Sequence, residues 1–142
     1  MLVRCLYASR SLAPLTKSVK ESILKQSRRN NPARGITGVL CYTDDLFLQM
    51  LEGGRDAVCE LFARIVGDPR HREVRILVYD EISERRFGGW TMGQVDISRV
   101  NPALLLKYSE KPVLDPFICP GTATIAMLHE LVDTASIESR GN

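Results

Sequence analysis

The chain has 142 residues, of which 44% are hydrophobic and 25% are charged, and its formal net charge is +2. This composition suits one compact domain with a real core, and the charge balance argues neither for nor against nucleic acid. No stretch is long and apolar enough for a signal peptide or a membrane span, so we expect a cytoplasmic protein without membrane contact. Four scattered cysteines and two histidines show no ligand spacing, so we expect no metal site.

The N-terminal part of the chain predicts a strand followed by a helix. Residues 2–9 are mostly apolar and indicate a first strand, which carries Tyr7. Residues 17–29 show helical spacing of apolar side chains, and Thr16 before them is a suitable N-cap. The pattern Asn-Asn-Pro at residues 30–32 ends this helix, because the residue before a proline is pushed out of the helical region.

A β-hairpin is predicted at the centre of the chain. Two apolar runs, residues 36–42 and 46–51, are separated by Thr-Asp-Asp, which tolerates tight-turn angles. In the second run only Gln49 is polar. Because strands alternate faces, Gln49 could point to solvent, or it could face a bound polar ring system. The spacing alone leaves both interpretations open. Residues 52–54 predict a break after the hairpin.

The next segments complete an α+β pattern. Residues 55–67 predict a second helix, residues 74–82 a fourth strand and residues 90–97 a fifth. The order strand, helix, strand, strand, helix, strand predicts a ferredoxin-like split βαβ fold. Its five-stranded mixed sheet should carry both helices on one face, because crossovers between parallel strands are right-handed.

The C-terminal part predicts two further helices. Residues 103–108 and 122–136 have helical patterns, and three prolines lie in the connector between them. The apolar stripe of the longer helix should either cover the second face of the sheet or form a dimer. We therefore expect a domain over residues 1–97 and a helical extension over residues 98–142.

Known enzyme signatures are largely missing from the sequence. It holds no phosphate-binding glycine loop, nucleophile elbow or paired-histidine metal motif. The charged turn around His71 is, taken alone, typical of a solvated loop. Tyr7, Gln49, Trp90 and Met92 stand where core residues are expected. A buried tyrosine usually only bonds its hydroxyl to a carbonyl, and a tryptophan with a methionine two residues on usually serves packing.

Five segments in order resemble one family. They are Leu6-Tyr7-Ala8-Ser9, residues 27–38 (Ser-Arg-Arg-Asn-Asn-Pro-Ala-Arg-Gly-Ile-Thr-Gly), residues 47–53 (Phe-Leu-Gln-Met-Leu-Glu-Gly), residues 68–71 (Asp-Pro-Arg-His) and residues 85–92 (Arg-Arg-Phe-Gly-Gly-Trp-Thr-Met). Together they resemble the BLUF family of flavin-based blue-light receptors, over about residues 2–97. Any one of these motifs would be weak, but five in the right order and separation are specific.

The resemblance implies that FAD, with FMN or riboflavin as alternatives, is held between the two helices. Tyr7 then matches the donor of an electron and a proton, and Gln49 the amide that links it to the flavin. Trp90 and Met92 match a pair whose exchange between buried and exposed positions is the suggested output step. The resemblance places these residues at the cofactor: Tyr7, Ile23, Ser27, Asn31, Phe47, Gln49, Arg64, Asp68, Arg70, His71 and Met92.

The implied function is that of a photoreceptor and not of an enzyme. Light-driven electron and proton transfer would leave Gln49 rearranged and the absorption reversibly shifted to the red. No output domain is recognised after residue 97, so the resemblance to short family members implies a separate downstream signalling protein. We further expect a homodimer or small oligomer, and no direct binding of nucleic acid.

Two alternatives belong to other classes. A ferredoxin-like binding module without a chromophore would need exposed aromatic side chains on the sheet to stack bases, but the strands offer mainly aliphatic ones. A small flavoenzyme or hydrolase would need an acid, base or nucleophile in a pocket, and the sequence shows none.

Overall fold

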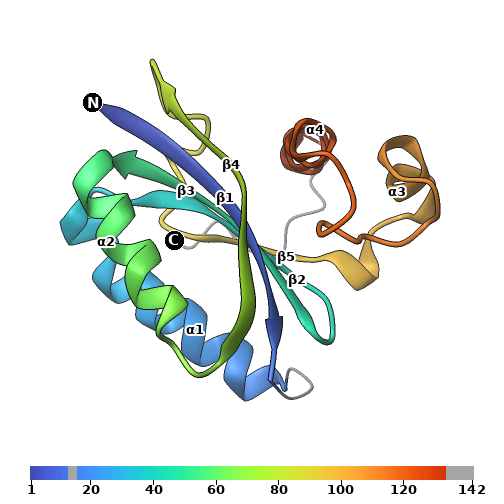
Figure 1. The fold of residues 1–142 in the computed structure, drawn as a ribbon, viewed down its shortest axis with the longest axis horizontal. Coiled ribbons are helices and arrows are strands. Elements are labelled where there is room, and N and C mark those ends of the chain that lie inside the picture. Colours follow the sequence, from blue (N-terminus) through green and yellow to red (C-terminus); the bar gives the residue numbers. More distant parts are fainter. Residues whose placement is uncertain (13–15, 134–142) are drawn as a thin grey trace.

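The computed structural model describes residues 1–12 and 16–133 (Figure 1). The strands are β1 (Leu2–Ser11), β2 (Thr37–Tyr42), β3 (Leu46–Gly54), β4 (His71–Ile82) and β5 (Gly93–Asp96). The helices are α1 (Lys17–Asn30), α2 (Arg55–Val66), α3 (Pro102–Tyr108) and α4 (Gly121–Asp133), with short 3-10 turns η1 (Pro32–Arg34) and η2 (Ile97–Arg99). As predicted, the Thr16 hydroxyl caps α1 by accepting from the backbone N–H of Val19.

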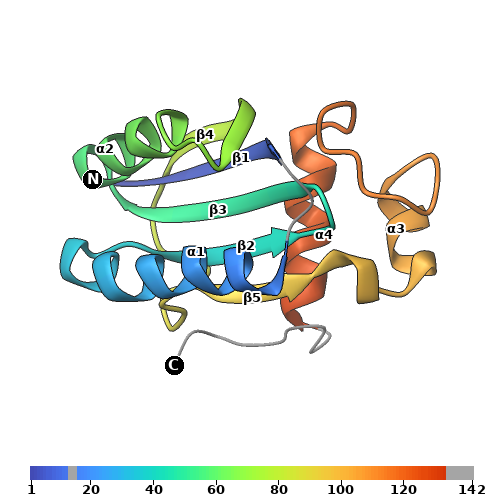
Figure 2. The ribbon, with the colours of Figure 1, turned by 90° about the horizontal axis from the view of Figure 1, so that it is seen from below.

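The five strands form one sheet in the order β4-β1-β3-β2-β5 (Figure 2). Neighbouring strands are antiparallel except β2 and β5, which are parallel. The parallel strands β1 and β2 are therefore separated by β3, as a split βαβ unit requires. This confirms the predicted ferredoxin-like, mixed five-stranded sheet.

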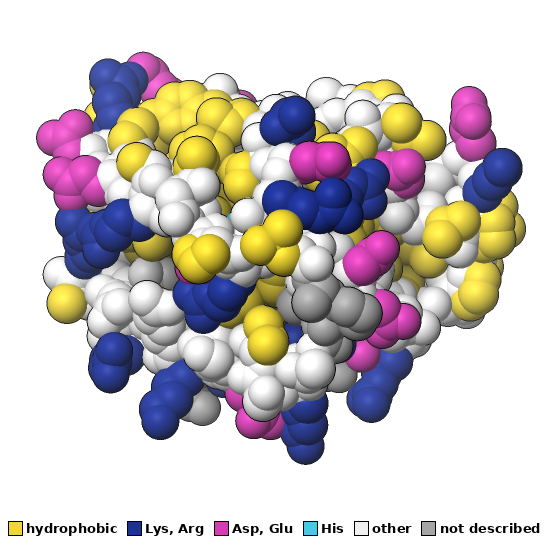
Figure 3. Space-filling model, turned by 60° about the horizontal axis from the view of Figure 1, so that its bottom comes forward, with side chains coloured by type: hydrophobic (Ala, Val, Ile, Leu, Met, Phe, Trp, Pro, Cys, Tyr) yellow, Lys and Arg dark blue, Asp and Glu magenta, His cyan; other side chains and the backbone are white. Residues whose placement is uncertain are grey.

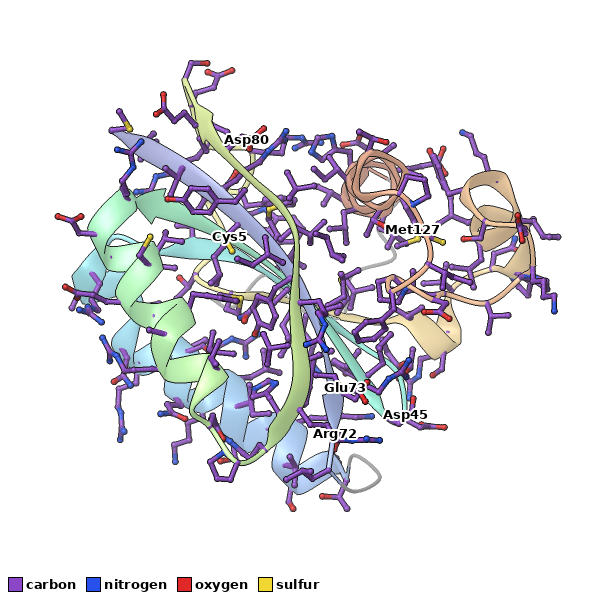
Figure 4. All side chains as sticks on the ribbon, in the orientation of Figure 1. Cys5, Asp45, Arg72, Glu73, Asp80 and Met127 are labelled. Carbon is purple, nitrogen blue, oxygen red and sulfur yellow. The ribbon has the colours of Figure 1, made fainter. Side chains whose placement is uncertain are left out.

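Helices cover both faces of the sheet and enclose two separate cores. Helices α1 and α2 lie on one face and α4 lies on the other (Figure 1). The first core includes Cys5 and Tyr7, and the second includes Leu48 and Met127. Cys5 and Met127 accordingly lie on opposite sides of the sheet (Figure 4). The prediction that a C-terminal helix covers the second face is confirmed. The part of that prediction beyond Asp133 lies outside the described residues.

Strand β3 is longer than predicted. We expected a break at residues 52–54, but Gly53 and Gly54 pair with Val3 and Leu2 of β1. Glycine is favoured at position 53, because a Cβ there would lie a tight 3.1 Å from the carbonyl oxygen of Gly35. Gly53 thus allows close packing within a strand that continues through both glycines.

The predicted fifth strand, residues 90–97, is too long at both ends. Strand β5 begins only at Gly93, and the chain turns into η2 after Asp96, whose side chain accepts from the N–H of Ser98. Before Gly93 the chain forms a tight loop, in which the Trp90 N–H donates to the Phe87 carbonyl at 2.9 Å. Local hydrogen bonds thus occur on both sides of β5, and before it one bond to β2 remains, from the Gly38 N–H to the Trp90 carbonyl at 3.2 Å.

Strands β1 and β4 extend further than predicted, and this changes the interpretation of His71. We expected β4 to begin at Val74, but Ser11 and His71 are partners at the far end of the β1–β4 ladder. The His71 side chain is buried. The interpretation of this segment as a solvated loop is wrong at His71, because pairing with β1 draws the residue into the sheet.

The surface described by the structure is of mixed charge. On the face shown in Figure 3, Lys and Arg side chains lie both at the border and in the middle of the view, with acidic side chains among them. Within the described residues, no helix is both long enough and apolar enough to cross a bilayer. The same residues contain no group of three or more metal-ligating side chains placed to hold an ion.

Candidate functional site

Tyr7 and Gln49 lie directly opposite each other on neighbouring strands. They are partners in the β1–β3 ladder, so both side chains project from the same face of the sheet. The Tyr7 hydroxyl donates to Oε1 of Gln49 in a short hydrogen bond. Gln49 is only 3% exposed, so the interpretation in which it points to solvent is wrong. Burial raises the pKa of Tyr7, which keeps the phenol protonated.

The other end of the Gln49 amide contacts Met92. Its Nε2 donates to the Met92 sulfur over 3.3 Å. Met92 is fully buried on the α1–α2 side, whereas Trp90 packs on the α4 side against Phe87, with ring centroids 5.5 Å apart. The sequence did not decide which of the two faces the glutamine. In this structure it is Met92.

A cavity of about 140 Å³ opens between α1 and α2 above these residues. Its lining includes the predicted cofactor residues Tyr7, Ile23, Ser27, Asn31, Gln49, Arg64, Asp68, Arg70 and His71. The other two, Phe47 and Met92, do not line it but are buried in the adjoining core. The fold therefore brings together residues that lie more than sixty positions apart in the chain.

The end of α1 places an unsatisfied amide in this cavity. Asn31 follows the last residue of α1, and its carbonyl accepts from the N–H groups of Arg34 and Ile36. Gly35 ends the turn in the left-handed region, φ 68°, which glycine adopts without strain. Asn31 is 2% exposed, and its Nδ2 has no hydrogen-bond partner among the described residues. A buried amide donor of this kind fits a flavin, whose ring offers carbonyl and imine acceptors.

A charged pair borders the cavity on its α2 side. Arg70 makes hydrogen bonds of 2.6–3.0 Å to the Asp68 carboxylate, and its backbone N–H adds another. These bonds hold the pKa of Asp68 below its usual value and raise that of Arg70. The pair therefore stays ionised and presents a fixed guanidinium at the cavity. Its Nη2 also donates to Oε1 of Gln26 on α1 at 2.8 Å, which joins the two walls.

His71 is held as a neutral ring beside Tyr7. Burial lowers its pKa, and Arg70 acts in the same direction although Asp68 opposes it. Its Nδ1 lies 2.7 Å from the Ser9 hydroxyl, and its ring packs on Phe47 at 4.8 Å between centroids. Phe47 thus supports the cavity wall from beneath.

Sequence reasoning missed part of the lining. The additional residues are Gln26, Asn30, Arg34, Leu61 and Ile65. Gln26 and Asn30 flank the predicted Ser27 at helical spacing, and Leu61 and Ile65 lie one turn apart on the apolar face of α2. Helical positions were predicted for Gln26, Leu61 and Ile65 but not for Asn30 and Arg34, which lie beyond the predicted end of the first helix. Their common approach to one cavity follows only from how α1 and α2 pack on the sheet.

A larger hollow of about 1150 Å³ lies elsewhere, beside α3 and the connector to α4. It includes residues of the β2–β3 turn but neither Tyr7 nor Gln49. The candidate site is therefore the smaller cavity, because that is where the paired polar groups converge.

The site thus combines a buried tyrosine–glutamine hydrogen bond with a cavity that holds an unsatisfied amide donor, on a ferredoxin-like sheet. Residues 2–93 match the family model BLUF, described as sensors of blue light using FAD. The chain belongs to the BLUF family.

Relatives and solved structures agree with this assignment. The photoactivated adenylate cyclase subunit beta of Euglena gracilis is 36% identical over 87 residues, which cover 61% of this chain and 10% of that protein. The blue light- and temperature-regulated antirepressor BluF of Escherichia coli (strain K12) is 33% identical over 81 residues, which cover 57% of this chain and 20% of that one. The chain therefore spans only a small part of these curated relatives.

The fold matches solved structures over most of its length. The photo-activated state of BlsA superposes with a TM-score of 0.82 at 31% identity, covering 93% of this chain and 95% of that one. The dark state of BlrB, a BLUF protein, superposes with a TM-score of 0.75 at 33% identity, covering 94% of this chain and 96% of that one. These matches confirm the predicted family, the ferredoxin-like α+β fold and the interpretation of the chain as a blue-light flavin sensor.

Proposed function

We propose that this chain is a blue-light photoreceptor in which Tyr7 and Gln49 convert light absorption by FAD into a hydrogen-bond rearrangement. The observation that carries the proposal is the continuous contact from the Tyr7 hydroxyl through the Gln49 amide to the Met92 sulfur, at the wall of the cavity. When bound there, the flavin ring would absorb blue light and accept an electron. Residues of the chain would donate the electron and the proton and undergo the rearrangement of hydrogen bonds.

Tyr7 supplies the electron and the proton in this mechanism. Its hydroxyl is protonated, buried and already bonded to Gln49, so a proton can move along a preformed path without reorganising solvent. Gln49 then rotates or changes tautomer, and the electron and proton return to Tyr7, so that the net change is a rearranged amide that has released the Met92 sulfur from its Nε2 donor. Met92 directly precedes β5, so a change at Gln49 reaches an edge strand of the sheet.

The remaining cofactor residues would hold the ring in place. Asn31 would donate to a ring carbonyl, Ile23 and Ser27 would contact the ring from α1, and Arg64, Asp68, Arg70 and His71 would border its other side. Phe47 would support His71 from below. The unsatisfied Asn31 amide supports this assignment. FAD is proposed as the natural flavin, with FMN or riboflavin as substitutes, because the contacts proposed here are all to the ring.

Downstream steps are proposed as well. Residues 1–97 would form the light-sensing unit and residues 98–142 a helical extension that relays its change to a separate signalling protein. A homodimer or small oligomer, a cytoplasmic location and the absence of catalytic turnover are part of the same proposal. The contact of α4 with the sheet core supports the relay.

The test is an absorption spectrum of the purified protein, supplied with FAD, in the dark and just after blue light. We expect flavin bands that shift to the red and return in darkness. A protein that refuses added FAD, or whose flavin bands never shift, contradicts the proposal. A colourless protein would instead favour the ferredoxin-like binding module without a chromophore.

A further inference from the structure

Arg34 carries a buried donor that the mechanism above does not use. Its side chain lines the same cavity as Tyr7 and Gln49, yet it lies on the short turn η1 and not on α1, α2 or the sheet. Its Nη1 is fully buried and has no hydrogen-bond partner within the described part of the chain. Buried polar groups in folded proteins are nearly always paired, and a charged donor left alone is the more costly case.

The rest of the guanidinium is held in place. Nη2 of Arg34 donates to the Glu60 carboxylate on α2 in a short ion pair. The backbone N–H of Arg34 donates to the Asn31 carbonyl at 3.0 Å. The side chain therefore bridges the end of α1 and the middle of α2. Because the planar guanidinium has fixed donor directions, fixing Nη2 also fixes the direction of Nη1.

Two unsatisfied donors thus occur in one cavity. Asn31 Nδ2 and Arg34 Nη1 are the two buried side-chain nitrogen or oxygen atoms without a partner among the residues described. Both are donors, and both residues line the cavity. A ligand that satisfies them must offer acceptors at its buried edge, as the carbonyl oxygens of a flavin ring do.

We propose that Arg34 is a further flavin-binding residue, whose Nη1 donates to a ring carbonyl oxygen while Nη2 stays on Glu60. This inference rests on the proposed function, because it takes the cavity as the flavin site. The contact is to the ring and not to the phosphates. Its positive charge would also favour the ring when it receives an electron from Tyr7.

The experiment measures riboflavin binding to flavin-free protein by quenching of flavin fluorescence. Riboflavin has no phosphate, so general attraction between arginine and phosphate plays no part. We expect Arg34→Gln to weaken binding about tenfold or more, as expected for loss of a charge-assisted hydrogen bond. The riboflavin affinity of Arg34→Lys should lie between those of Arg34→Gln and the wild type, because lysine keeps the positive charge but lacks the forked geometry of the guanidinium. In the dark, the flavin absorption bands of Arg34→Gln should lie at shorter wavelength than those of the wild type.

The matched control is Arg29→Gln, which removes the same charge from an exposed position of α1 outside the cavity lining. Its affinity should stay within about twofold of the wild type, since exposed charges contribute little. Glu60→Gln should weaken binding less than Arg34→Gln, because it loosens the arginine without removing it. Thermal unfolding of the flavin-free variants checks that each is folded.

The outcomes separate the two proposals. If Arg34→Gln binds riboflavin as tightly as the wild type, or if Arg29→Gln loses as much affinity, the assignment of Arg34 is wrong while the photoreceptor proposal stands. If folded wild-type protein binds neither riboflavin nor FAD, the proposed function fails, and the role of Arg34 fails with it.

Discussion

The Gln49 amide lies between a phenol and a thioether, with Nε2 donating to the Met92 sulfur over 3.3 Å and Oε1 accepting from Tyr7. Sulfur is a weak acceptor, so this bond holds the amide less firmly than a carbonyl would. Gln49 is thus fixed at its oxygen and loosely held at its nitrogen. Because both atoms belong to one planar amide, turning Nε2 away from the Met92 sulfur also turns Oε1 away from the Tyr7 hydroxyl.

Gln49→Leu should keep the flavin and the fold but abolish the red shift, because leucine fills similar space without a hydrogen-bonding group. Absorption spectra before and after blue light measure this. The matched control is Gln94→Leu, which removes an amide on β5 that donates to the Tyr42 hydroxyl at 2.7 Å outside the cavity. An unaltered photocycle in Gln49→Leu would remove Gln49 from the mechanism.

Tyr7→Phe should bind flavin but lose the productive light reaction, since the ring stays while the transferable proton is removed. Transient absorption after a blue pulse measures the reaction. Tyr42→Phe is the control, because Tyr42 is a buried tyrosine of the same core that does not line the cavity. A normal cycle in Tyr7→Phe, or equal loss in both variants, would refute the proposed proton path.

Acidification should destabilise the flavin-free protein through His71. Because burial lowers its pKa in the folded state, the unfolded chain binds the proton more readily. Stability should therefore be greatest above about pH 6.5 and decline as the pH falls through that value. Burial lowers the pKa of His129 too, so it acts in the same direction.

Urea unfolding between about pH 7.5 and about pH 5.5 measures this effect, because these values lie about one unit on either side of the free imidazole pKa. His71→Gln should flatten the decline more than His129→Gln, since His71 is the more deeply buried ring. An unchanged slope in His71→Gln would show that this residue does not carry the pH dependence.

Glu52 anchors the loop that leads to Trp90 and Met92. It is 2% exposed, and its carboxylate accepts the backbone N–H groups of Arg86 and Phe87 at 2.7 and 2.8 Å. Glu52→Ala would leave two donors without an acceptor, so we expect a loss of about 1–3 kcal/mol in the free energy of unfolding.

The fluorescence of Trp90, the single tryptophan of the chain, should report a more solvated ring in Glu52→Ala. Glu84→Gln, an exposed change near the same loop, should leave stability and fluorescence unchanged. Equal behaviour of the two variants would show that the Glu52 contacts do not hold the loop.

Helix α4 should be part of the folding unit. Leu128 is 1% exposed in the core between α4 and the sheet, so Leu128→Ala should cost about 2–5 kcal/mol in urea unfolding. Leu106→Ala is the control in α3, where the side chain is 51% exposed, and it should change stability by no more than about 0.5 kcal/mol. If Leu128→Ala is as mild as Leu106→Ala, α4 is only loosely docked.

This packing also changes how the relay can be tested. Removing everything after Ser109 would uncover the apolar face of the sheet that α4 covers. Loss of partner regulation in such a truncated protein would therefore not separate a relay from unfolding. Single substitutions such as Arg86→Gln, which removes an exposed ion pair to Asp133 on α4, are the cleaner probes.

By itself the sequence determined the elements, their order and the family. Apolar periodicity marks helices and strands because 3.6-residue and two-residue repeats place side chains on one face, and five ordered motifs mark the BLUF pattern. The pairing of Tyr7 with Gln49 was implied by that resemblance. Their direct opposition in the β1–β3 ladder needed the strand register, which a single sequence does not show.

Only the tertiary structure decided which residue meets the glutamine, where the strands end and which donors lack partners. Met92 lies on the α1–α2 side and Trp90 on the α4 side, at the end of the loop that Glu52 holds through contacts between segments more than thirty residues apart. The role inferred for Arg34 depends on its approach from η1 to Glu60 on α2. Such long-range contacts arise from the packing of whole elements, and local residue patterns do not record them.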